Sequence, residues 1–290
     1  MFMKSKLQLL SAMGIFGTVG IFVKFIPLSS ATTAFCRGIL GVAFLILLMA
    51  VTRQKPAWTA IRKNLPVLIR SGVAIGLNWV LFFESFRYTS VAIATVCYYL
   101  APLFLILMSP LIGEQLNGKK LLCIAVAFTG MALLSGITDS ANVSGDQLLG
   151  IALATGAAIL YASVMLLNKK LSPIPAYDKT VLQLGAASLV LVPYLLLTRS
   201  FSFVGLTTGG WGSLLIVGIV HTGVAYAMYF DSMKSLPAHT IAIFSYLDPV
   251  LAVVLSAVVL KEPLSLWGGI GAVLILGSAL YSELPERKKG

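Results

Sequence analysis

The sequence contains very little charge for its length. Only 11% of its 290 residues are charged, whereas about a quarter of the residues of a soluble domain carry charge. Hydrophobic residues make up 58% of the chain and the mean hydropathy is +0.96. This composition excludes a cytosolic enzyme, a disordered protein and a secreted disulfide scaffold. It predicts an all-α membrane protein, because only helices satisfy their own backbone across lipid in so apolar a chain.

Residues for covalent or metal chemistry are also scarce. The three cysteines, Cys36, Cys97 and Cys123, lie in apolar runs without paired spacing, so no disulfide framework or zinc site is indicated. The sequence lacks His-Glu-x-x-His, Gly-x-Ser-x-Gly and Gly-rich phosphate-binding motifs. We therefore expect no catalytic residue, no metal, no cofactor and no enzyme activity. Direct hydrolysis of ATP by this chain is not expected, since a nucleotide-binding motif is missing.

Apolar runs bounded by charges or by Pro and Gly clusters predict ten transmembrane helices. The expected spans are 7–26, 31–51, 67–87, 91–111, 119–138, 147–168, 177–197, 211–233, 238–260 and 264–283. Glycines at positions 14, 17 and 20 and at positions 72 and 76 have the spacing that lets helices approach closely. Longer connections are expected only at 52–66 and 198–210.

The basic residues predict the orientation. With the N-terminus in the cytoplasm, sixteen lysines and arginines fall on the cytoplasmic side and four on the other side, and reversing the topology inverts that ratio. The sixteen are Lys4, Lys6, Arg53, Lys55, Arg62, Lys63, Arg70, Lys119, Lys120, Lys169, Lys170, Lys179, Lys234, Arg287, Lys288 and Lys289. Both termini are expected in the cytoplasm. The net charge of +11 thus reflects topology, and no nucleic-acid partner is expected.

The chain contains an internal repeat. Tyr99-Leu100-Ala101-Pro102 recurs 147 positions later as Tyr246-Leu247-Asp248-Pro249, and Phe83-Glu84-Ser85 recurs as Phe230-Asp231-Ser232. The repeat predicts two five-helix halves, 1–139 and 146–290, the second ending in a short basic tail. Because five is odd, the second half enters the membrane from the opposite side. Inverted repeats are the architecture of many secondary transporters, whose substrate sites lie near mid-depth between the repeats.

With these features the sequence resembles the EamA-type family of the drug/metabolite transporter superfamily. The resemblance rests on the ten spans, on Arg37, and on a "YL-x-P" element that precedes Gly113-Glu114 in one half and Lys261-Glu262 in the other. Two departures are Phe16, where many members carry Trp, and a Pro102–Glu114 interval one residue shorter than its partner. The resemblance implies export or import of small metabolites, often amino acids or drugs.

Three polar residues within the expected spans are candidates for substrate binding. Asp248, near mid-span and beside Pro249, can attract a cationic group or take a proton. His221 suits proton coupling, and Asn78 can both donate and accept hydrogen bonds. Each has a structural alternative as an interhelical hydrogen-bonding residue.

Aromatic residues at central depth are candidates for stacking on a solute or for cation–π contact. Those predicted to line a substrate site are Trp79, Phe82, Tyr99, Tyr229 and Tyr246. Ordinary helix packing is the alternative for several of them.

Charged residues near the span ends are candidates for gating or structural ion pairs. Glu84 and Arg87, like Asp231 and Lys234, stand three positions apart, a spacing that allows an intrahelical pair. Arg37 lies about two turns inside its span, where its guanidinium can extend toward the interface, pair with an acid or meet a substrate carboxylate.

Pro102 and Pro249 occupy equivalent places in the fourth and ninth spans. Each removes a backbone hydrogen bond, so we expect these spans to bend there as hinges during alternating access. The alternative is that both prolines only shape a permanent cavity.

The sequence therefore predicts a secondary transporter, an exporter of amino acids or related amphipathic compounds, in a bacterial-type cytoplasmic membrane. The expected partners are a small-molecule substrate and the lipid bilayer, with proton coupling as one option and a monomer or homodimer as the assembly. A carrier of cationic solutes is the alternative, and a scramblase or membrane-embedded enzyme is a third, distant one.

Overall fold

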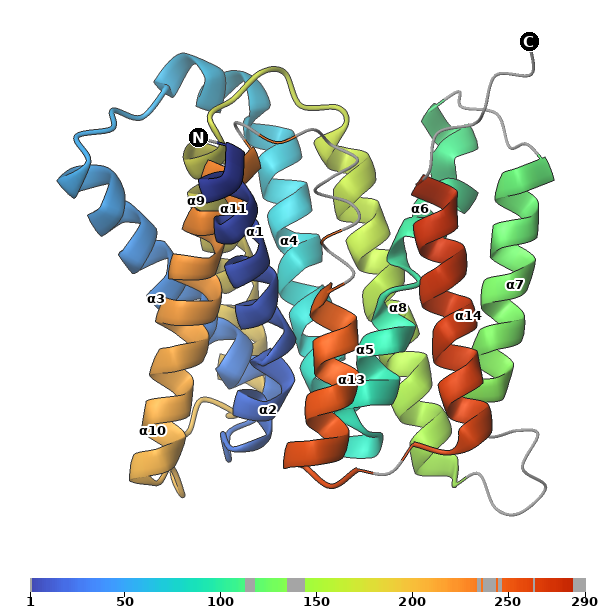
Figure 1. The fold of residues 1–290 in the computed structure, drawn as a ribbon. Coiled ribbons are helices and arrows are strands. Elements are labelled where there is room, and N and C mark those ends of the chain that lie inside the picture. The colour runs from blue at the N-terminus through green and yellow to red at the C-terminus, as the bar shows by residue number, and fades with distance from the viewer. Residues whose placement is uncertain are drawn as a thin grey trace, which may run out of the picture.

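The computed structural model describes residues 2–112, 118–134, 144–233, 236, 244, 247–262 and 264–283. Over these ranges all regular structure is helical, as Figure 1 shows. The helices are α1 (Phe2–Gly17), α2 (Val19–Lys24), α3 (Ser30–Val51), α4 (Trp58–Tyr88), α5 (Val91–Tyr98), α6 (Ala101–Met108), η1 (Ser109–Ile112), α7 (Gly118–Leu134), α8 (Gly145–Asn168), α9 (Ala176–Leu197), α10 (Thr208–Leu215), η2 (Ile216–Val224), α11 (Ala225–Met233), α13 (Leu247–Val259) and α14 (Leu266–Glu283).

Seven helical segments within the described ranges are long and apolar enough to cross a membrane. They are Met3–Lys24, Ser30–Val51, Trp58–Tyr88, Val91–Met108, Gly145–Asn168, Ala176–Leu197 and Thr208–Ser232. Shorter apolar helices, at Leu121–Leu133, Leu247–Val259 and Leu266–Ser278, lie within the three remaining expected spans. Large apolar side chains face outward, as at Leu197 (85% exposed) and Val273 (70% exposed), which suits a lipid surrounding.

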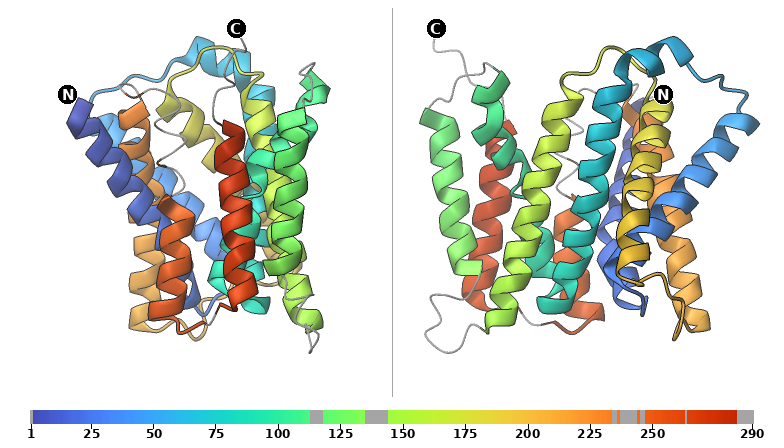
Figure 2. Two further views of the ribbon diagram at one scale, coloured as in Figure 1. Left: turned by 45° about the vertical axis from the view of Figure 1, so that its right-hand side comes forward. Right: turned by 180° about the vertical axis from the view of Figure 1, so that it is seen from behind.

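Helices at corresponding places in the two halves run in opposite directions. In Figure 1, α1 runs downward from the end where the N-terminus lies, whereas α8 starts at the lower end and runs upward. The same inversion relates the rising α5 and α6 to the descending α13. The packing is reciprocal as well, because α1 contacts α11 and α13 while α8 contacts α4, α5 and α6. The helices α7 and α14 pack on each other at one edge of the bundle (Figure 2).

Close approach of α4 and α9 depends on two of the predicted glycines. A Cβ atom at Gly72 would lie 2.6 Å from the Gln183 carbonyl oxygen, and one at Gly76 would lie 2.5 Å from that of Ala187. Gly17 similarly makes room for the backbone of Asp248. Gly14 has no neighbour within 4 Å, so the predicted packing role is wrong for that residue.

One expected connection is shorter than the sequence indicates. Residues 58–66 belong to α4, which begins at Trp58 and contains Pro66. The start of this helix is anchored to the other half: the Asp178 carboxylate accepts a hydrogen bond from the Ala57 N–H (2.9 Å), and the Asn64 side chain bonds the Ser172 backbone. These tertiary bonds extend the helix beyond its apolar run.

Candidate functional site

Helices near the middle of the bundle are interrupted. α1 and α2 are separated at Thr18, and α5 and α6 are separated at Tyr99 and Leu100. Pro102 is the second residue of α6 and Pro249 the third of α13, so both lie in a first turn, where a missing N–H costs no intrahelical bond. The sequence predicts a bend within a continuous fourth span. The structure instead has a break between α5 and α6, just before Pro102.

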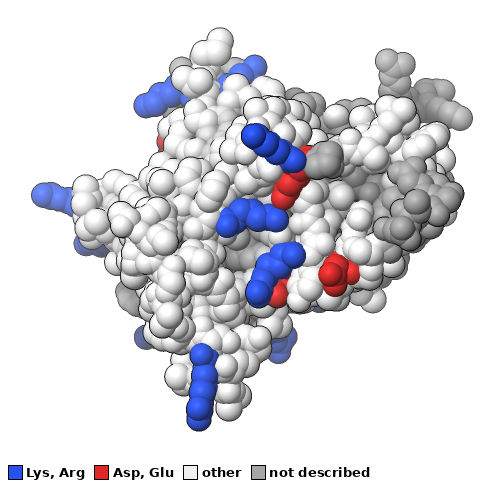
Figure 3. Space-filling model, turned by 90° about the horizontal axis from the view of Figure 1, so that it is seen from below, with Lys and Arg blue, Asp and Glu red and all other residues white. Residues whose placement is uncertain are grey.

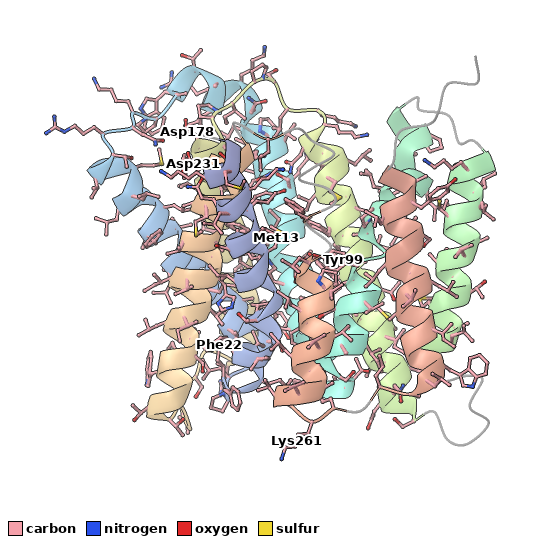
Figure 4. All side chains as sticks on the ribbon, viewed as in Figure 1. Met13, Phe22, Tyr99, Asp178, Asp231 and Lys261 are labelled. Atoms are coloured by element: carbon pink, nitrogen blue, oxygen red, sulfur yellow. The ribbon has the colours of Figure 1, made fainter. Side chains whose placement is uncertain are left out.

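A hydrogen bond joins the two halves at one of these breaks. The Tyr99 hydroxyl donates to Asp248 Oδ2 at 2.7 Å, from the α5–α6 break to the first turn of α13. Figure 4 places Tyr99 about midway between the two ends of the bundle, beside the start of α13. The structure therefore brings two predicted site residues, one from each half, into direct contact. Tyr246, their expected companion, lies outside the described residues.

Arg37 is buried in the interior and does not extend to the interface. Its Nε donates to Thr222 Oγ1 at 2.8 Å, and its guanidinium lies 4.5 Å above the Trp79 ring and 5.5 Å from the Phe83 ring. The side chain is only 6% exposed. Extension toward the membrane surface, one of the sequence-based options, is wrong because these partners hold the guanidinium inside.

Asn78 and Phe82 belong to a polar and aromatic cluster between α4, α5 and α8. Asn78 Nδ2 donates to the Ala157 carbonyl at 2.6 Å, and Asn78 Oδ1 accepts from the Tyr98 hydroxyl at 3.3 Å. The Tyr98 ring stacks on Phe82 at 4.4 Å and on Tyr161 at 5.4 Å. Asn78 thus already ties three helices together, in agreement with the packing alternative.

Tyr229 belongs to a second aromatic cluster, on the side of α1. Its ring lies 6.4 Å from Phe16 and 5.8 Å from Phe230, and Tyr226 lies 5.4 Å from Phe16. The Phe16 position, where the resembling family often has Trp, therefore faces an aromatic surface of the other half.

His221 lies in η2, a π-helical stretch within the eighth expected span. Its Nε2 is 2.8 Å from Thr18 Oγ1, at the α1–α2 break, and its Nδ1 is 3.2 Å from the Ile216 carbonyl oxygen. Because a carbonyl oxygen only accepts, Nδ1 carries a hydrogen in this arrangement. π-helical turns occur frequently at functional sites. The histidine is 1% exposed and contacts the broken first span directly.

Charged side chains form contacts both within α4 and between helices at the lower end of the bundle. Arg87 pairs with Glu84 at 3.1 Å, and the Ser30 hydroxyl donates to Glu84. Glu262 is more extensively bonded: it pairs with Lys24 at 3.2 Å and accepts from the Val91 N–H and the Ser256 hydroxyl. Figure 3 shows charged side chains gathered near the middle of this face, surrounded by a largely uncharged surface.

At the opposite end, Asp231 accepts a hydrogen bond from Gln8 Nε2 at 3.2 Å, which joins α11 to α1. Figure 4 shows Asp231 near the upper end together with Asp178. Its expected partner Lys234 lies outside the described residues, as do Gly113 and Glu114.

Two surface hollows of the described residues lie elsewhere and do not coincide with these side chains. One is lined by α14 and the connection before it, and the other by α7 and α14, both almost entirely with apolar side chains. The described ranges contain no group of three or more His, Cys, Asp or Glu side chains placed to hold a metal ion. The contacts of Arg37, Asn78 and Tyr99 place the candidate site in the interior between α3, α4, η2, α5 and α13.

A known protein family matches both halves of the chain. The profile of the EamA-like transporter family matches twice, at residues 3–136 and 148–282. The chain belongs to this family. A relative from Bacillus subtilis (strain 168), "Uncharacterized transporter YxxF", is 32% identical over 276 residues, covering 94% of this chain and 88% of its own.

Two other proteins are similar to this chain of the EamA-like transporter family. A "Probable amino-acid metabolite efflux pump" of Escherichia coli (strain K12) is 32% identical over 180 residues, 58% of each chain. A solved crystal structure of a protein has the same fold, with a TM-score of 0.65 at 20% sequence identity over 96% of both chains. Family and helices together make the chain a multi-pass membrane protein whose relatives are named transporters.

Sequence reasoning missed three residues with long-range partners: Thr18 and Thr222 beside the candidate site, and Glu262 at the lower end of the bundle. No substrate-binding or gating role was predicted for them. Threonines are common within apolar spans, and the position of Glu262 favours a structural role in capping a helical hairpin. Their importance comes from partners more than 170 positions away in the sequence, on other helices. A periodicity argument cannot identify such pairs.

Proposed function

We propose that this chain is a secondary carrier that exports a small organic metabolite by alternating access. Ten transmembrane helices form two inverted five-helix repeats, 1–139 and 146–290, with both termini in the cytoplasm of a bacterial-type inner membrane. The doubly matching family profile and the opposed helix directions support this arrangement. The basic residues of α1, of the α3–α4 connection and of the α8–α9 connection lie at one end of the bundle, as the positive-inside rule requires.

The observation that carries the proposal is the Tyr99–Asp248 hydrogen bond. It connects a helix break in the first half to the first turn of a helix in the second half, at mid-depth. Interrupted helices that meet near the midplane are the typical substrate and coupling-ion sites of carriers. A carboxylate at this depth is costly, and such residues typically mark a substrate or proton path.

Amino acids or related amphipathic compounds are the substrates that this interior fits best. They combine an apolar part, which aromatic rings can cover, with charged groups that Asp248 and Arg37 can meet. The name of the Escherichia coli relative supports the same class. Cationic solutes such as quaternary ammonium compounds are the second candidate, because Tyr99 bonds Asp248 and the Tyr98 ring lies beside Tyr99.

Counterflow into proteoliposomes tests the carrier function. Vesicles loaded with an unlabelled amino acid should accumulate the same labelled amino acid transiently, without ATP and with saturation. A panel of twenty amino acids and several quaternary ammonium compounds would separate the two substrate classes. Absence of counterflow for every compound, together with rapid exchange of labelled lipid between leaflets, would instead establish a scramblase.

Cysteine labelling tests the topology. Single cysteines at positions 56, 174 and 288 should react only from the cytoplasm, and those at positions 142 and 205 only from outside. Labelling of positions 142 and 174 from the same side would rule out the inverted arrangement.

A further inference from the structure

We propose that Arg37 binds the carboxylate of the transported substrate and thereby selects zwitterions over cations that lack a carboxylate. The inference rests on the proposed carrier function and deepens it. It assigns to Arg37 a direct role in substrate recognition, and to Thr222 a positioning role.

The guanidinium is buried but only partly bonded. Nε is satisfied by Thr222 Oγ1, whereas the two terminal amino groups have no hydrogen-bond or ion-pair partner among the described residues. Among described side chains, only Thr89 Oγ1 is both fully enclosed and without a partner. The terminal amino groups of Arg37 therefore still reach open space inside a bundle that otherwise satisfies its polar atoms. An arginine fork with two free donors matches the geometry of a carboxylate.

A permanent positive charge at this place needs an explanation. An unpaired charge within a membrane protein is costly, and such residues usually pair with one another or mark a substrate path. The Trp79 and Phe83 rings offset part of the cost through cation–π contact. The rings carry no net negative charge, so the guanidinium remains without an anionic partner among the described side chains. An anionic group of the substrate can therefore form the ion pair that these side chains do not supply.

The π-helical turn of η2 positions the fork. The Thr222 hydroxyl donates to the Val217 carbonyl, five residues earlier, at 3.0 Å, and this bond turns its lone pairs toward the Arg37 Nε–H. Gly41 makes room for Thr222 on α3, since a Cβ atom there would lie 3.0 Å from Thr222 Cβ. Because Nε is held by this bond, the orientation of the guanidinium plane, and with it that of the two terminal amino groups, is restricted.

Asp248 supplies the complementary charge. Its carboxylate is within electrostatic range of the guanidinium, as are the Tyr98 and Tyr226 hydroxyls, yet no described carboxylate forms an ion pair with Arg37. A zwitterion can thus bring its carboxylate to Arg37 of the first half and its ammonium to Asp248 of the second. A ligand held between the two halves is what alternating access requires.

Matched ligands test the proposal in the full-length protein in proteoliposomes. The probes are L-phenylalanine and L-leucine, their amides, and the amines phenethylamine and isoamylamine, which keep the ammonium and lose the carboxylate. For the wild type we expect inhibition of counterflow by the amino acids at concentrations about 10- to 100-fold lower than by the amides and amines, the worth of a charge-assisted hydrogen bond. Arg37→Gln should remove this ratio, whereas Arg62→Gln, at an exposed arginine of α4, should preserve it.

Thr222→Val keeps the shape of the side chain and removes the bond to Nε. We expect it to lower the ratio about 3- to 10-fold, less than Arg37→Gln, because the guanidinium remains but is no longer fixed. It also keeps the test informative if Arg37→Gln fails to fold. A merely structural Arg37 would weaken all probes equally, leaving the ratio unchanged, and that result would overturn the proposal.

Two outcomes separate this inference from the proposed function. If the wild type shows counterflow but accepts amines and amino acids equally, the carrier function holds and the role of Arg37 is refuted. If Arg37→Gln and Asp248→Asn each abolish transport and the double variant restores it, the arginine only balances Asp248 and the proposal is again refuted. Lack of any counterflow by the wild type contradicts the proposed function itself.

Discussion

The α7–α14 pair and the centre of the bundle are both built from apolar helices, but they are organised differently. α7 and α14 pack closely on each other, with large apolar side chains turned outward, and their surface hollows are apolar. The centre contains helix breaks, a π-helical turn and buried Arg37, Asn78 and His221. Regular helices satisfy their own backbone in lipid, whereas interrupted ones are tolerated where other protein groups bond them. Function is therefore expected at the breaks.

The strongest test of this contrast is the removal of the central carboxylate. Asp248→Asn keeps a partner for the Tyr99 hydroxyl but loses the charge. We expect counterflow to fall at least about 10-fold, because the lost interaction is charge-assisted. Val273→Ala, on the exposed face of α14, should keep the wild-type rate. Wild-type flux in Asp248→Asn with unchanged dependence on pH would make Asp248 a structural residue.

A glycine substitution tests whether the outer pair depends on close packing alone. A Cβ atom at Gly130 of α7 would lie 2.7 Å from the Gly271 carbonyl oxygen, while Gly277 of α14 has no neighbour within 4 Å. Gly130→Ala should destabilise the protein by about 1–3 kcal/mol through overpacking. Gly277→Ala should leave thermal unfolding in detergent nearly unchanged. Equal unfolding temperatures for both variants would contradict the assigned packing.

The prolines test whether the central breaks move. Pro102→Ala and Pro249→Ala each restore a backbone N–H near a helix start. If the breaks act as hinges, the two variants should shift the accessibility of cysteines at the two mouths in opposite directions, a shift of a few-fold. Unchanged accessibility in both, with altered stability, would mean that the prolines only shape the helices.

The smallest effect is expected at the connection between the two regions. Glu262 lies between α13 and α14 and binds Lys24, the Val91 N–H and Ser256. Lys24→Gln removes one partly exposed ion pair, worth about 1 kcal/mol or less. It should modestly increase labelling of cysteines at the lower end. Lys261→Gln, at the neighbouring exposed lysine, is the matched control. An equal increase in labelling for this control would show that the Lys24–Glu262 pair does not specifically restrict access at the lower end.

Much of the fold follows from the sequence because the membrane restricts it. Hydropathy places most described helices within a few residues, but α13 begins at Leu247, well inside the expected span 238–260, and α4 starts early at Trp58. That start depends on Asp178 and Ser172, which are more than 100 positions away. Of the candidate site, the sequence names Tyr99 and Asp248 as separate candidates, and their hydrogen bond is visible only in the structure.

By itself the sequence determined the membrane class, the family resemblance and the identity of the polar residues within the spans. Because polar residues are rare in so apolar a chain, each of them can be identified from the sequence alone. Only the tertiary structure decided their partners: Arg37 on Thr222 and Trp79, Asn78 on Ala157, and His221 on Thr18. A buried polar group needs a hydrogen-bond partner, but the periodicity of the sequence predicts only the helix face on which the group lies. Which helix lies opposite, and at what height, depends on how all the helices pack.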